Sequence, residues 1–414
     1  MVNREVGAAA DRRLIFFAAG LRSSAVGLSG IILAFHLSLL GLNAWSIGIA
    51  ISLGLTGCAV GTAAVAYAAD WLGRRATLII LALLMALGGL AFSWTTVPSA
   101  LLASALLGMV NGMGRDRGAG VTVDQAILPQ TTTASRRTTV FAWYNLTIDG
   151  GHAVGSLLSI LPALLRAQGV SPLASYQWTW RCYSLLCLAA GLLALRLSAQ
   201  VELRHAATLR RLSSSTRPVV AKFAALSGLD SLGGGFLTTA LLSYWFFKRF
   251  GVDETLLAPL FFVVRIANGL SHLGAAWIAR RIGLINTMVF THLPSSLLLM
   301  TVPFAPTLPV AIALFLVRES LVEMDVPTRQ SYIVAVVREE ERTRAAGITN
   351  LTRSFAWAAA PLAAGSLMRL SLSAPLVVGA GLKVVYDLLL YRAFRHLKPP
   401  EERAASAEGF AASP

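Results

Sequence analysis

The sequence predicts an all-α membrane protein in which twelve transmembrane helices form two pseudo-symmetric six-helix bundles. Three observations support this fold class. The chain of 414 residues is 56% hydrophobic and only 13% charged. It divides into six plus six long apolar segments, and parts of its first half recur in its second half. Together these features indicate a chain that folds in a lipid bilayer.

The composition excludes a soluble globular protein. Soluble domains carry about 25% charged residues, which cover their surface. In a bilayer, a helix of about 20 apolar residues crosses the hydrocarbon core and satisfies its backbone polar groups internally. The three cysteines lie singly in apolar runs without a C-x-x-C pair. The sequence therefore predicts no disulfide framework, no metal site and no cofactor.

Each apolar segment has the length of a transmembrane helix and ends at a charge or at a proline or glycine turn. The first follows the charged start MVNREVGAAADRR and is too long for a signal peptide, so we expect it to remain as a span. The segments of the first half lie at about residues 14–38, 45–69, 75–95, 98–123, 138–165 and 175–197. Those of the second half lie at about residues 218–247, 255–279, 284–304, 307–330, 345–368 and 373–394.

The domain boundaries follow from this division. We predict an N-terminal bundle over residues 1–197 and a C-terminal bundle over residues 218–400. The polar segment 198–217 between them is expected to be a cytoplasmic linker. Residues 401–414 are polar and rich in small side chains, which predicts a disordered cytoplasmic tail.

The distribution of lysine and arginine predicts the orientation. With the N-terminus inside, the inner segments hold 22 of the 35 basic residues and the outer segments hold 5. Both termini are therefore predicted to be cytoplasmic, in a multi-pass protein of the cytoplasmic (inner) membrane. The net charge of +15 is then spread over many inner loops. It does not indicate a nucleic-acid-binding patch.

An internal repeat relates the two halves. At a shift of 205 residues, Arg137 aligns with Arg342, and the triplet Asn-Leu-Thr at 145–147 aligns with the same triplet at 350–352. A second correspondence pairs AYAADWLGRRATLII with AAWIARRIGLINTMV, aligned on Gly73 and Gly283. Transporter halves are often related by such weak symmetry, so duplication explains these matches better than chance.

The turn between the second and third segments carries a motif. Residues 70–75 read DWLGRR, which resembles the signature G-x-L-x-D-r-x-G-r-r/k of the major facilitator superfamily. The twelve-span plan of that family covers nearly the whole chain. In it, this turn latches the two halves in one orientation, and a glycine permits the tight turn. The resemblance, with the corresponding turn of the second half, implies these gating residues: Asp70, Gly73, Arg74, Arg75 and Gly283.

The fourth segment contains the stretch NGMGRDRGAG at residues 111–120. The family has an Arg-x-x-Gln-Gly-x-Gly motif here; this chain keeps the glycines but has Asn111 for the glutamine and lacks the arginine. We interpret the glycines as close-packing surfaces between helices. A dinucleotide loop is excluded because no strand precedes it. Of Arg115, Asp116 and Arg117, one or two are expected to face the cavity and another to pair with acidic residues of the tenth span.

The fifth segment carries the main candidates for proton coupling. Asp149 and His152 are three residues apart and lie on one helical face. An acid beside a histidine can titrate near neutral pH, which proton coupling requires. At the shift of 205, Ile148 and Asp149 correspond to Arg353 and Ser354, so we predict a bridging Asp149–Arg353 ion pair. A hydrogen-bonded structural histidine is the alternative for His152.

Other polar residues within the spans are further candidates, because ionisable groups at membrane depth are costly and usually face a partner or a wet cavity. For the substrate and proton pathway these are Arg22, Asp230, Arg265, Glu319 and Glu323. The aromatic residues Trp143, Tyr144, Tyr244 and Trp245 are more typical of an interface belt than of substrate stacking.

The resemblance implies a secondary active transporter that works by alternating access. No G-x-S-x-G, H-E-x-x-H or P-loop motif and no long soluble domain occurs, so we do not expect an enzyme. We expect proton-coupled efflux by antiport, although the family's antiporter signature is not met in the fifth segment. The open alternatives are an uptake symporter or uniporter for a small polar metabolite and a non-transporting membrane receptor. The expected partners are a small-molecule substrate, protons and the lipid bilayer, with the protein acting as a monomer that binds no nucleic acid.

Overall fold

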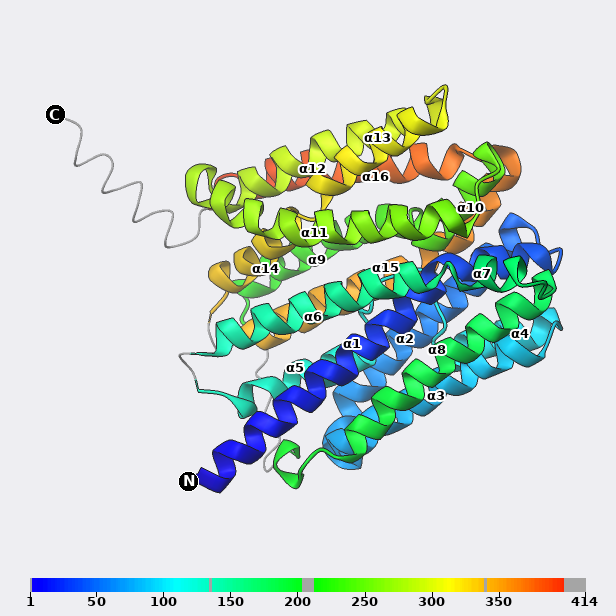
Figure 1. Ribbon diagram of the computed structural model, residues 1–414. Coiled ribbons are helices and arrows are strands. Elements are labelled where there is room, and N and C mark those ends of the chain that lie inside the picture. The colour runs from blue at the N-terminus through cyan, green and yellow to red at the C-terminus, as the bar shows by residue number, and fades with distance from the viewer. Residues whose placement is uncertain (1, 134–135, 203–211, 339–340, 398–414) are drawn as a thin grey trace. The chain divides into compact units, whose positions relative to one another are not determined.

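The computed structural model describes residues 2–133, 136–202, 212–338 and 341–397. All regular structure in these residues is helical, with sixteen α-helices and short 3-10 turns (Figure 1). Eight helical stretches in this part of the chain are long and apolar enough to cross a membrane. The predicted disordered tail at 401–414 lies outside the described residues, as do residues 203–211 of the predicted linker.

The six expected spans of the first half form eight helices. Local sequence explains several of their ends: Asn43 and Ser171 cap helices by accepting backbone N–H groups, and Pro98 begins a helix where its missing N–H costs nothing. The helices are α1 (Val2–Leu39), α2 (Ala44–Leu72), α3 (Arg74–Trp94), α4 (Pro98–Leu107), α5 (Ala119–Ile127), α6 (Arg137–Leu158), α7 (Leu161–Ala167) and α8 (Pro172–Leu195).

The second half also forms eight helices. Prolines inside α11, α12 and α15 do not end those helices. The helices are α9 (Thr216–Gly235), α10 (Thr239–Phe250), α11 (Glu254–Ile282), α12 (Leu284–Thr301), α13 (Leu308–Val322), α14 (Asp325–Val336), α15 (Arg342–Leu370) and α16 (Ala374–Phe394). All twelve expected spans are matched by one helix or by two consecutive helices, in agreement with the predicted fold class.

Four of the expected spans are interrupted. Residues 108–118 separate α4 from α5, and residues 159–160 separate α6 from α7. Residues 236–238 separate α9 from α10, and residues 323–324 separate α13 from α14. The prediction of continuous fourth, fifth, seventh and tenth spans is therefore wrong. In the fourth span, Met109 and Gly114 have positive φ angles of 52° and 69°, which an α-helix cannot include. The glycines of NGMGRDRGAG thus belong to an unwound segment, which we call segment 108–118.

The helices form two compact units. The first unit comprises Met1–Ala206, Gly235–Ile266 and Trp357–Pro375, and the second comprises Ala207–Gly234, Ala267–Ala356 and Leu376–Pro414. Two stretches of the second half of the sequence therefore belong to the first unit. The boundary between two sequence halves at residues 198–217 stays a prediction.

In the first unit, α1 packs against α6 and α8, and α3 packs against α8 (Figure 1). Small residues allow the close approach of α1 and α6. A Cβ atom on Gly27 would lie 2.5 Å from the carbonyl oxygen of His152, so a larger residue cannot occupy this contact. Close packing at glycine is a common mode of helix association in membranes.

The second unit has an aromatic core between α9, α12, α14 and α16. The rings of Phe223 and Phe394 meet edge to face with centroids 5.6 Å apart, and Tyr332 stacks on Phe223 at 5.8 Å. Edge-to-face and offset contacts suit the quadrupoles of these rings. This core supports the ends of the helices that carry a buried charge network in the same unit.

Candidate functional site

In the first unit, the interruption of the fourth span meets the interruption of the seventh. The backbone N–H of Ala240 donates to the carbonyl oxygen of Gly112 at 2.9 Å, and the Thr239 hydroxyl donates to the carbonyl oxygen of Met113 at 3.0 Å. A Cβ atom on Gly112 would lie 2.5 Å from the Ala240 methyl group. The expected close packing at glycine is confirmed. The glycines lie in unwound backbone, however, and carbonyl groups of this backbone accept hydrogen bonds from the seventh span.

His152 on α6 holds segment 108–118 in place. Its Nε2 atom accepts the backbone N–H of Asp116 at 2.6 Å, and its Nδ1 atom lies 3.9 Å from Oδ1 of Asp149. His152 is 3% exposed, whereas the Asp149 side chain is 32% exposed. Because Nε2 is an acceptor here, the ring hydrogen is on Nδ1, which faces Asp149. The structure thus brings Asp149 and His152 together, as their spacing predicts.

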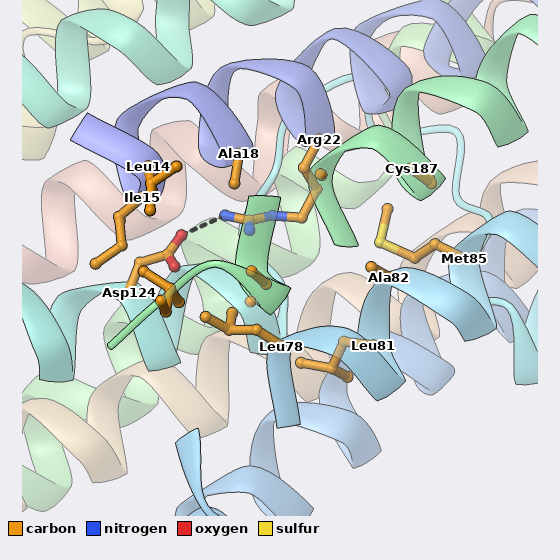
Figure 2. Close-up of a pocket in the computed structure, with 14 residues that line it drawn as sticks. Leu14, Ile15, Ala18, Arg22, Leu78, Leu81, Ala82, Met85, Asp124 and Cys187 are labelled. Atoms are coloured by element: carbon orange, nitrogen blue, oxygen red, sulfur yellow. Dashed lines mark hydrogen bonds and ion pairs between the residues drawn. The ribbon is translucent and has the colours of Figure 1, made fainter. Parts of the chain in front are cut away.

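Arg22 on α1 joins segment 108–118 to α5. Its Nε atom lies 2.5 Å from Oδ2 of Asp116. Its Nη2 atom lies 2.7 Å from Oδ2 of Asp124 (Figure 2). The Tyr144 hydroxyl donates to the same Asp124 oxygen at 2.8 Å. Arg22 and Asp116 were predicted site residues, but Asp124 and Tyr144 were not predicted in this role. Asp124 is the single carboxylate of α5, and this sequence feature could have indicated that it needs a partner.

Three of the four aromatic residues predicted for an interface belt are buried. Trp143 is 60% exposed, but Tyr144, Tyr244 and Trp245 are buried. Their polar atoms explain two of these positions: Tyr144 bonds Asp124, and the Trp245 indole donates to the Ser373 hydroxyl at 3.0 Å. The belt prediction is wrong for these three residues, since buried Tyr and Trp are stable where their polar atoms find partners.

The remaining charged candidates of the first unit lie around the same interruption. Arg265 on α11 donates from Nη2 to the Thr239 hydroxyl at 2.9 Å. Arg117 lies over the Trp357 ring, 4.8 Å from its centroid, which is a cation–π geometry. Arg115 is partly buried. The expected pairing of this stretch with the tenth span stays a prediction, and Asp116 is bound by Arg22 instead.

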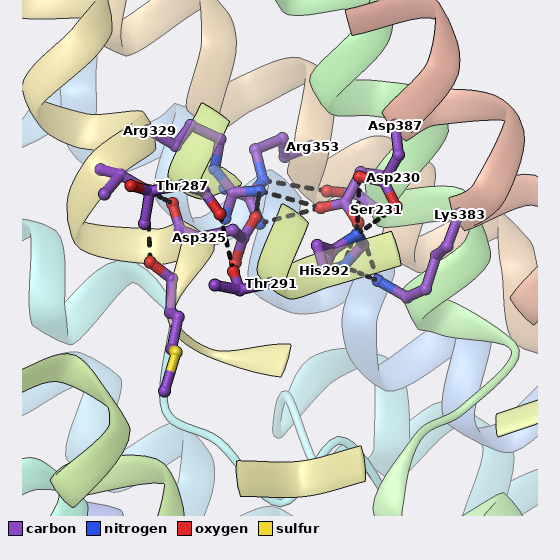
Figure 3. Close-up of polar contacts among 12 residues, drawn as sticks. Asp230, Ser231, Thr287, Thr291, His292, Asp325, Arg329, Arg353, Lys383 and Asp387 are labelled. Carbon is purple, nitrogen blue, oxygen red and sulfur yellow. Dashed lines mark hydrogen bonds and ion pairs between the residues drawn. The ribbon is translucent and has the colours of Figure 1, made fainter. Parts of the chain in front are cut away.

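The second unit contains a separate network of buried charges (Figure 3). Asp230 on α9 is its centre. The Asp230 carboxylate lies 2.7 Å from Nζ of Lys383, 3.0 Å from Nη1 of Arg329 and 3.8 Å from Nη2 of Arg353. Asp230 is 4% exposed. One carboxylate thus connects α9 with α14, α15 and α16.

The other members of this network complete its charge balance. Asp325 pairs with Arg329 at 2.6 Å, and Asp387 lies 2.9 Å from Nδ1 of His292. Lys383 lies 3.3 Å from the other ring nitrogen of His292. Three carboxylates therefore face two guanidinium groups and one ammonium group, and the network is neutral when His292 is uncharged. His292 and Asp387 were not predicted, although a lone aspartate in the apolar twelfth span was a usable signal.

The predicted Asp149–Arg353 pair joins residues of different units. Within the second unit, Arg353 donates from Nε to the Ser231 hydroxyl at 2.9 Å in addition to its contact with Asp230. The bridging pair therefore stays a prediction.

The acidic candidates of the tenth span lie near its interruption. Glu319 is buried and pairs with Arg318, and Asn268 on α11 donates to its backbone carbonyl at 2.7 Å. Glu323 lies in the gap between α13 and α14. Both carboxylates therefore lie close to an interrupted helix, where backbone carbonyl groups and helix ends can also contact a ligand.

The predicted gating turn joins α2 to α3. The backbone N–H groups of Arg74 and Arg75 donate to the two carboxylate oxygens of Glu202, at 2.7 Å and 3.2 Å. Glu202 thereby caps the start of α3, a role that the sequence did not indicate. The Arg74 side chain donates to the carbonyl oxygen of Ala126 at 3.1 Å. The side chain of Asp70 lies outside the described residues.

Comparisons with known proteins bear on the family and the fold. Residues 15–361 match the model of the family described as Major Facilitator Superfamily. An uncharacterized membrane protein of Saccharomyces cerevisiae, YJR124C, is 25% identical over 92% of this chain and 94% of its own length.

Solved structures share the fold at low sequence identity. The nucleoside transporter NupG has a TM-score of 0.70 and 14% identity, covering 94% of this chain and 98% of its own. A D-xylose-proton symporter has a TM-score of 0.70 and 15% identity, with coverage of 91% and 97%. The human organic anion transporter MFSD10 has a TM-score of 0.63 and 18% identity, with coverage of 92% and 99%. These similarities concern the fold.

Proposed function

We propose that this chain, which belongs to the Major Facilitator Superfamily, is a proton-coupled secondary transporter of a small polar molecule. The observation that carries the proposal is the contact between His152 and segment 108–118. A titratable nitrogen holds the unwound part of a span, in a fold whose members move solutes by alternating access.

The geometry supplies a physical route from protonation to movement. Nε2 of His152 accepts the Asp116 N–H at 2.6 Å, so this nitrogen has no free lone pair for a proton. A proton on Nε2 turns the acceptor into a donor that faces another donor, and the bond is lost. Proton binding and the observed position of segment 108–118 therefore exclude each other.

The consequence reaches the seventh span. Segment 108–118 also bonds to Thr239 and Ala240 at the interruption between α9 and α10. Loss of the bond to His152 removes one contact that holds segment 108–118 and, through it, the start of α10. Backbone groups that lose their partners at the two interruptions can then bind a ligand. The proton-loaded and proton-free forms thus present different binding surfaces, as exchange of a proton for a substrate requires. We therefore propose export in exchange for protons, with gating at Asp70, Gly73, Arg74, Arg75 and Gly283.

The test uses purified protein in liposomes with a pH gradient imposed in either direction. Labelled uridine, D-xylose and fluorescein serve as probes, because structural neighbours carry names for nucleoside, xylose and organic anion transport. His152→Gln keeps an oxygen that accepts the Asp116 N–H but binds no proton. We expect it to lose gradient-driven flux and to retain probe-for-probe exchange.

His396→Gln is the matched control, because His396 is exposed beyond α16 and should leave the flux unchanged. Gradient-driven flux in His152→Gln equal to that of the wild type would reject the coupling role. Movement of a probe in the same direction as protons would indicate uptake symport in place of export by antiport. In cells, resistance of overproducing strains to toxic compounds supports export, whereas a growth defect of strains lacking the protein on one nutrient supports uptake.

A further inference from the structure

We propose that the end of α11, the start of α12 and the end of α16 form a binding site for the headgroup of an anionic phospholipid (Figure 1). All three helix ends belong to the second unit. The site, which we call the ring–arginine site, consists of Trp277, Arg281, Phe290, Tyr391 and Arg395 with two further arginines. It does not rest on the proposed function, because a transporter of any substrate or direction lies in the same bilayer.

Two pairs of a ring and an arginine repeat one pattern. The Arg281 Cζ atom lies 4.0 Å from the centroid of the Trp277 ring, and the Arg395 Cζ atom lies 5.7 Å from the centroid of the Tyr391 ring. Both are cation–π contacts. In each pair the arginine follows the ring by four positions, so it lies one helical turn, about 6 Å, closer to the end of the helix. Each pair therefore places a ring toward the bilayer and a charge toward its surface.

The rings of the site lie at one depth. Trp277 precedes the turn at Gly283 by six residues and Phe290 follows it by seven, so the rise of about 1.5 Å per residue places both roughly 10 Å from the turn. The Phe290 ring contacts the Tyr391 ring with centroids 5.8 Å apart. Trp277 and Phe290 are 51% and 54% exposed. Rings at this level of a helix are typical of the membrane interface.

The arginines of the site have no counter-charge among the described residues. Arg280 and Arg392 lie in the last turns of α11 and α16 and complete the set of four. All four are exposed, and none forms an ion pair with a carboxylate of the described residues. A hydrogen bond from Nε of Arg395 to Nε2 of His396 at 2.9 Å supplies no negative charge. Arg329, within the same unit, instead pairs with two buried carboxylates.

A phospholipid with a negative headgroup fits both levels of this site. A guanidinium binds phosphate oxygens through two parallel N–H groups. The acyl chains of the same molecule cover the exposed rings below, which a free phosphate ion would leave uncovered. In the predicted orientation these helix ends face the cytoplasmic leaflet, which carries the anionic lipids. The rival explanation is a general attraction of basic residues to a negative surface, which needs neither a ring nor a guanidinium.

Tryptophan fluorescence in bilayers tests the proposal without a substrate. The bilayers contain equal amounts of phosphatidylglycerol and phosphatidylcholine, and the upper acyl chain of one lipid at a time carries bromine, which quenches the rings that it contacts. The signal of Trp277 is the difference between the wild type and Trp277→Phe. We expect phosphatidylglycerol to quench this signal several-fold more than phosphatidylcholine. Equal quenching by the two lipids would overturn the proposal.

Two variants of Arg281 separate the ring–arginine site from general attraction. Arg281→Gln should lower the preference for phosphatidylglycerol about fivefold, the factor that corresponds to about 1 kcal/mol for one basic side chain near an anionic surface. Arg281→Lys keeps the charge but loses the planar group that contacts the ring and binds phosphate through two N–H groups. We expect it to lose the preference as Arg281→Gln does. A preference that Arg281→Lys retains in full would establish general attraction and overturn the site.

Trp178 and Arg181 on α8 of the first unit are the matched control. The Arg181 Cζ atom lies 4.3 Å from the centroid of the Trp178 ring, and Trp178 is 54% exposed. Because α8 begins at Pro172, Arg181 lies farther from this helix end than its ring, which is the reverse order. The difference between the wild type and Trp178→Phe should therefore show no lipid preference. Both leaflets have the same composition in this assay, and an equal preference at Trp178 would contradict the site.

The same assay distinguishes two other occupants. Inorganic phosphate, compared with chloride at equal ionic strength, should leave the preference unchanged, and a preference that phosphate abolishes would make a free anion the occupant. A preference that appears only in the double variant Glu401→Gln and Glu402→Gln would make the tail of this chain the occupant and overturn the proposal. Failure of the flux experiment on His152 would leave these fluorescence results intact.

Discussion

Gly73 and Gly283 have the same backbone φ angle of 87°, although they lie in different halves of the sequence. Their ψ angles of 142° and 165° are also similar. Each glycine ends one long helix and starts the next, at α2–α3 and at α11–α12. This combination of φ and ψ is close to a region that only glycine occupies readily. The sequence alignment at a shift of 210 residues thus corresponds to a repeated backbone turn.

We predict that Gly73→Ala destabilises the protein by about 1–3 kcal/mol, the usual cost of forcing a side chain into this backbone region. A Cβ atom at this position would also lie 3.1 Å from the Glu202 carboxylate that caps α3. The measurement is the thermal unfolding midpoint in detergent. Gly269→Ala is the control, because its Cβ atom would meet no atom within 4 Å and its φ is not positive. Equal midpoints for Gly73→Ala and Gly269→Ala would contradict the role of the turn.

The sequence predicted the spans well because hydrophobic length and charge breaks are local properties. The predicted ranges 45–69, 75–95 and 373–394 agree closely with α2, α3 and α16. The interruptions were missed for a physical reason. Residues 323–324 contain no glycine or proline and carry no local signal that a helix stops, whereas the glycines at 233–235, directly before residues 236–238, were a signal that went unused. The backbone there is set by contacts with distant residues, such as Thr239 with Met113.

The site was predicted less completely than the fold. Asp149 with His152 followed from helical spacing, which acts within one helix. The contacts of Arg22 with Asp116 and Asp124 span 94 and 102 residues, and no periodicity reveals such distances. The contact between His292 and Asp387, which lie on different helices of the second unit, was not predicted for the same reason. Lone charges in apolar spans indicated which residues need partners, and the structure identifies those partners.

The Asp230 network supports a prediction about stability. Asp230→Asn leaves Lys383, Arg329 and Arg353 without their shared carboxylate, so we expect a loss of about 3–5 kcal/mol, as for other broken buried pairs. Thermal unfolding measures this loss. Adding Lys383→Met restores the charge balance and should recover part of it.

The control for this prediction is Asp253→Asn. The Asp253 side chain is 45% exposed and lies 3.8 Å from Arg166, so its loss should cost less than about 1 kcal/mol. If Asp230→Asn behaves like this control, the network does not stabilise the second unit.

Glu341, which precedes α15, supports a prediction about pH. A hydrogen bond from the Thr216 hydroxyl, with a second from the Ser213 backbone N–H at 2.5 Å, holds the pKa of the Glu341 carboxyl below its usual range. A lowered pKa in the folded state contributes stability at neutral pH, and this contribution is lost as the pH falls below the ordinary value of about 4.3. The unfolding midpoints of the wild type and Glu341→Gln should therefore differ at pH 7 and converge on acidification.

Thr216→Val separates this effect from general acid sensitivity. It removes the main cause of the lowered pKa of Glu341, so the difference from Glu341→Gln at pH 7 should shrink while other carboxylates remain unchanged. Midpoints that differ by the same amount at pH 7 and at about pH 2 would show that titration of Glu341 does not contribute.

A last prediction concerns the pair of Arg166 on α7 and Glu254 in the first turn of α11. Nη1 of Arg166 lies 2.6 Å from Oε1 of Glu254, and the Tyr176 hydroxyl lies 3.3 Å from the same carboxylate. Glu254 is 1% exposed. The pair joins the two halves of the sequence within the first unit, at the predicted outer side. Alternating access requires such contacts to break and re-form in each cycle.

A double-mutant cycle of Arg166→Gln and Glu254→Gln should give a coupling energy of about 1–2 kcal/mol, reduced from that of a fully buried pair because the Arg166 side chain is 26% exposed. The corresponding cycle of Arg166 with Asp253 should give less than about 0.5 kcal/mol, since that pair is longer and more exposed. Additive effects in the first cycle would show that Arg166 and Glu254 do not hold the two halves of the sequence together. If the coupling is measured, Glu254→Gln should raise the population of the form in which Arg166 and Glu254 are apart. The expected increase is roughly tenfold, since 1.4 kcal/mol corresponds to that factor. Labelling of a cysteine introduced at Ser373, beside Trp245, can report this shift as faster modification.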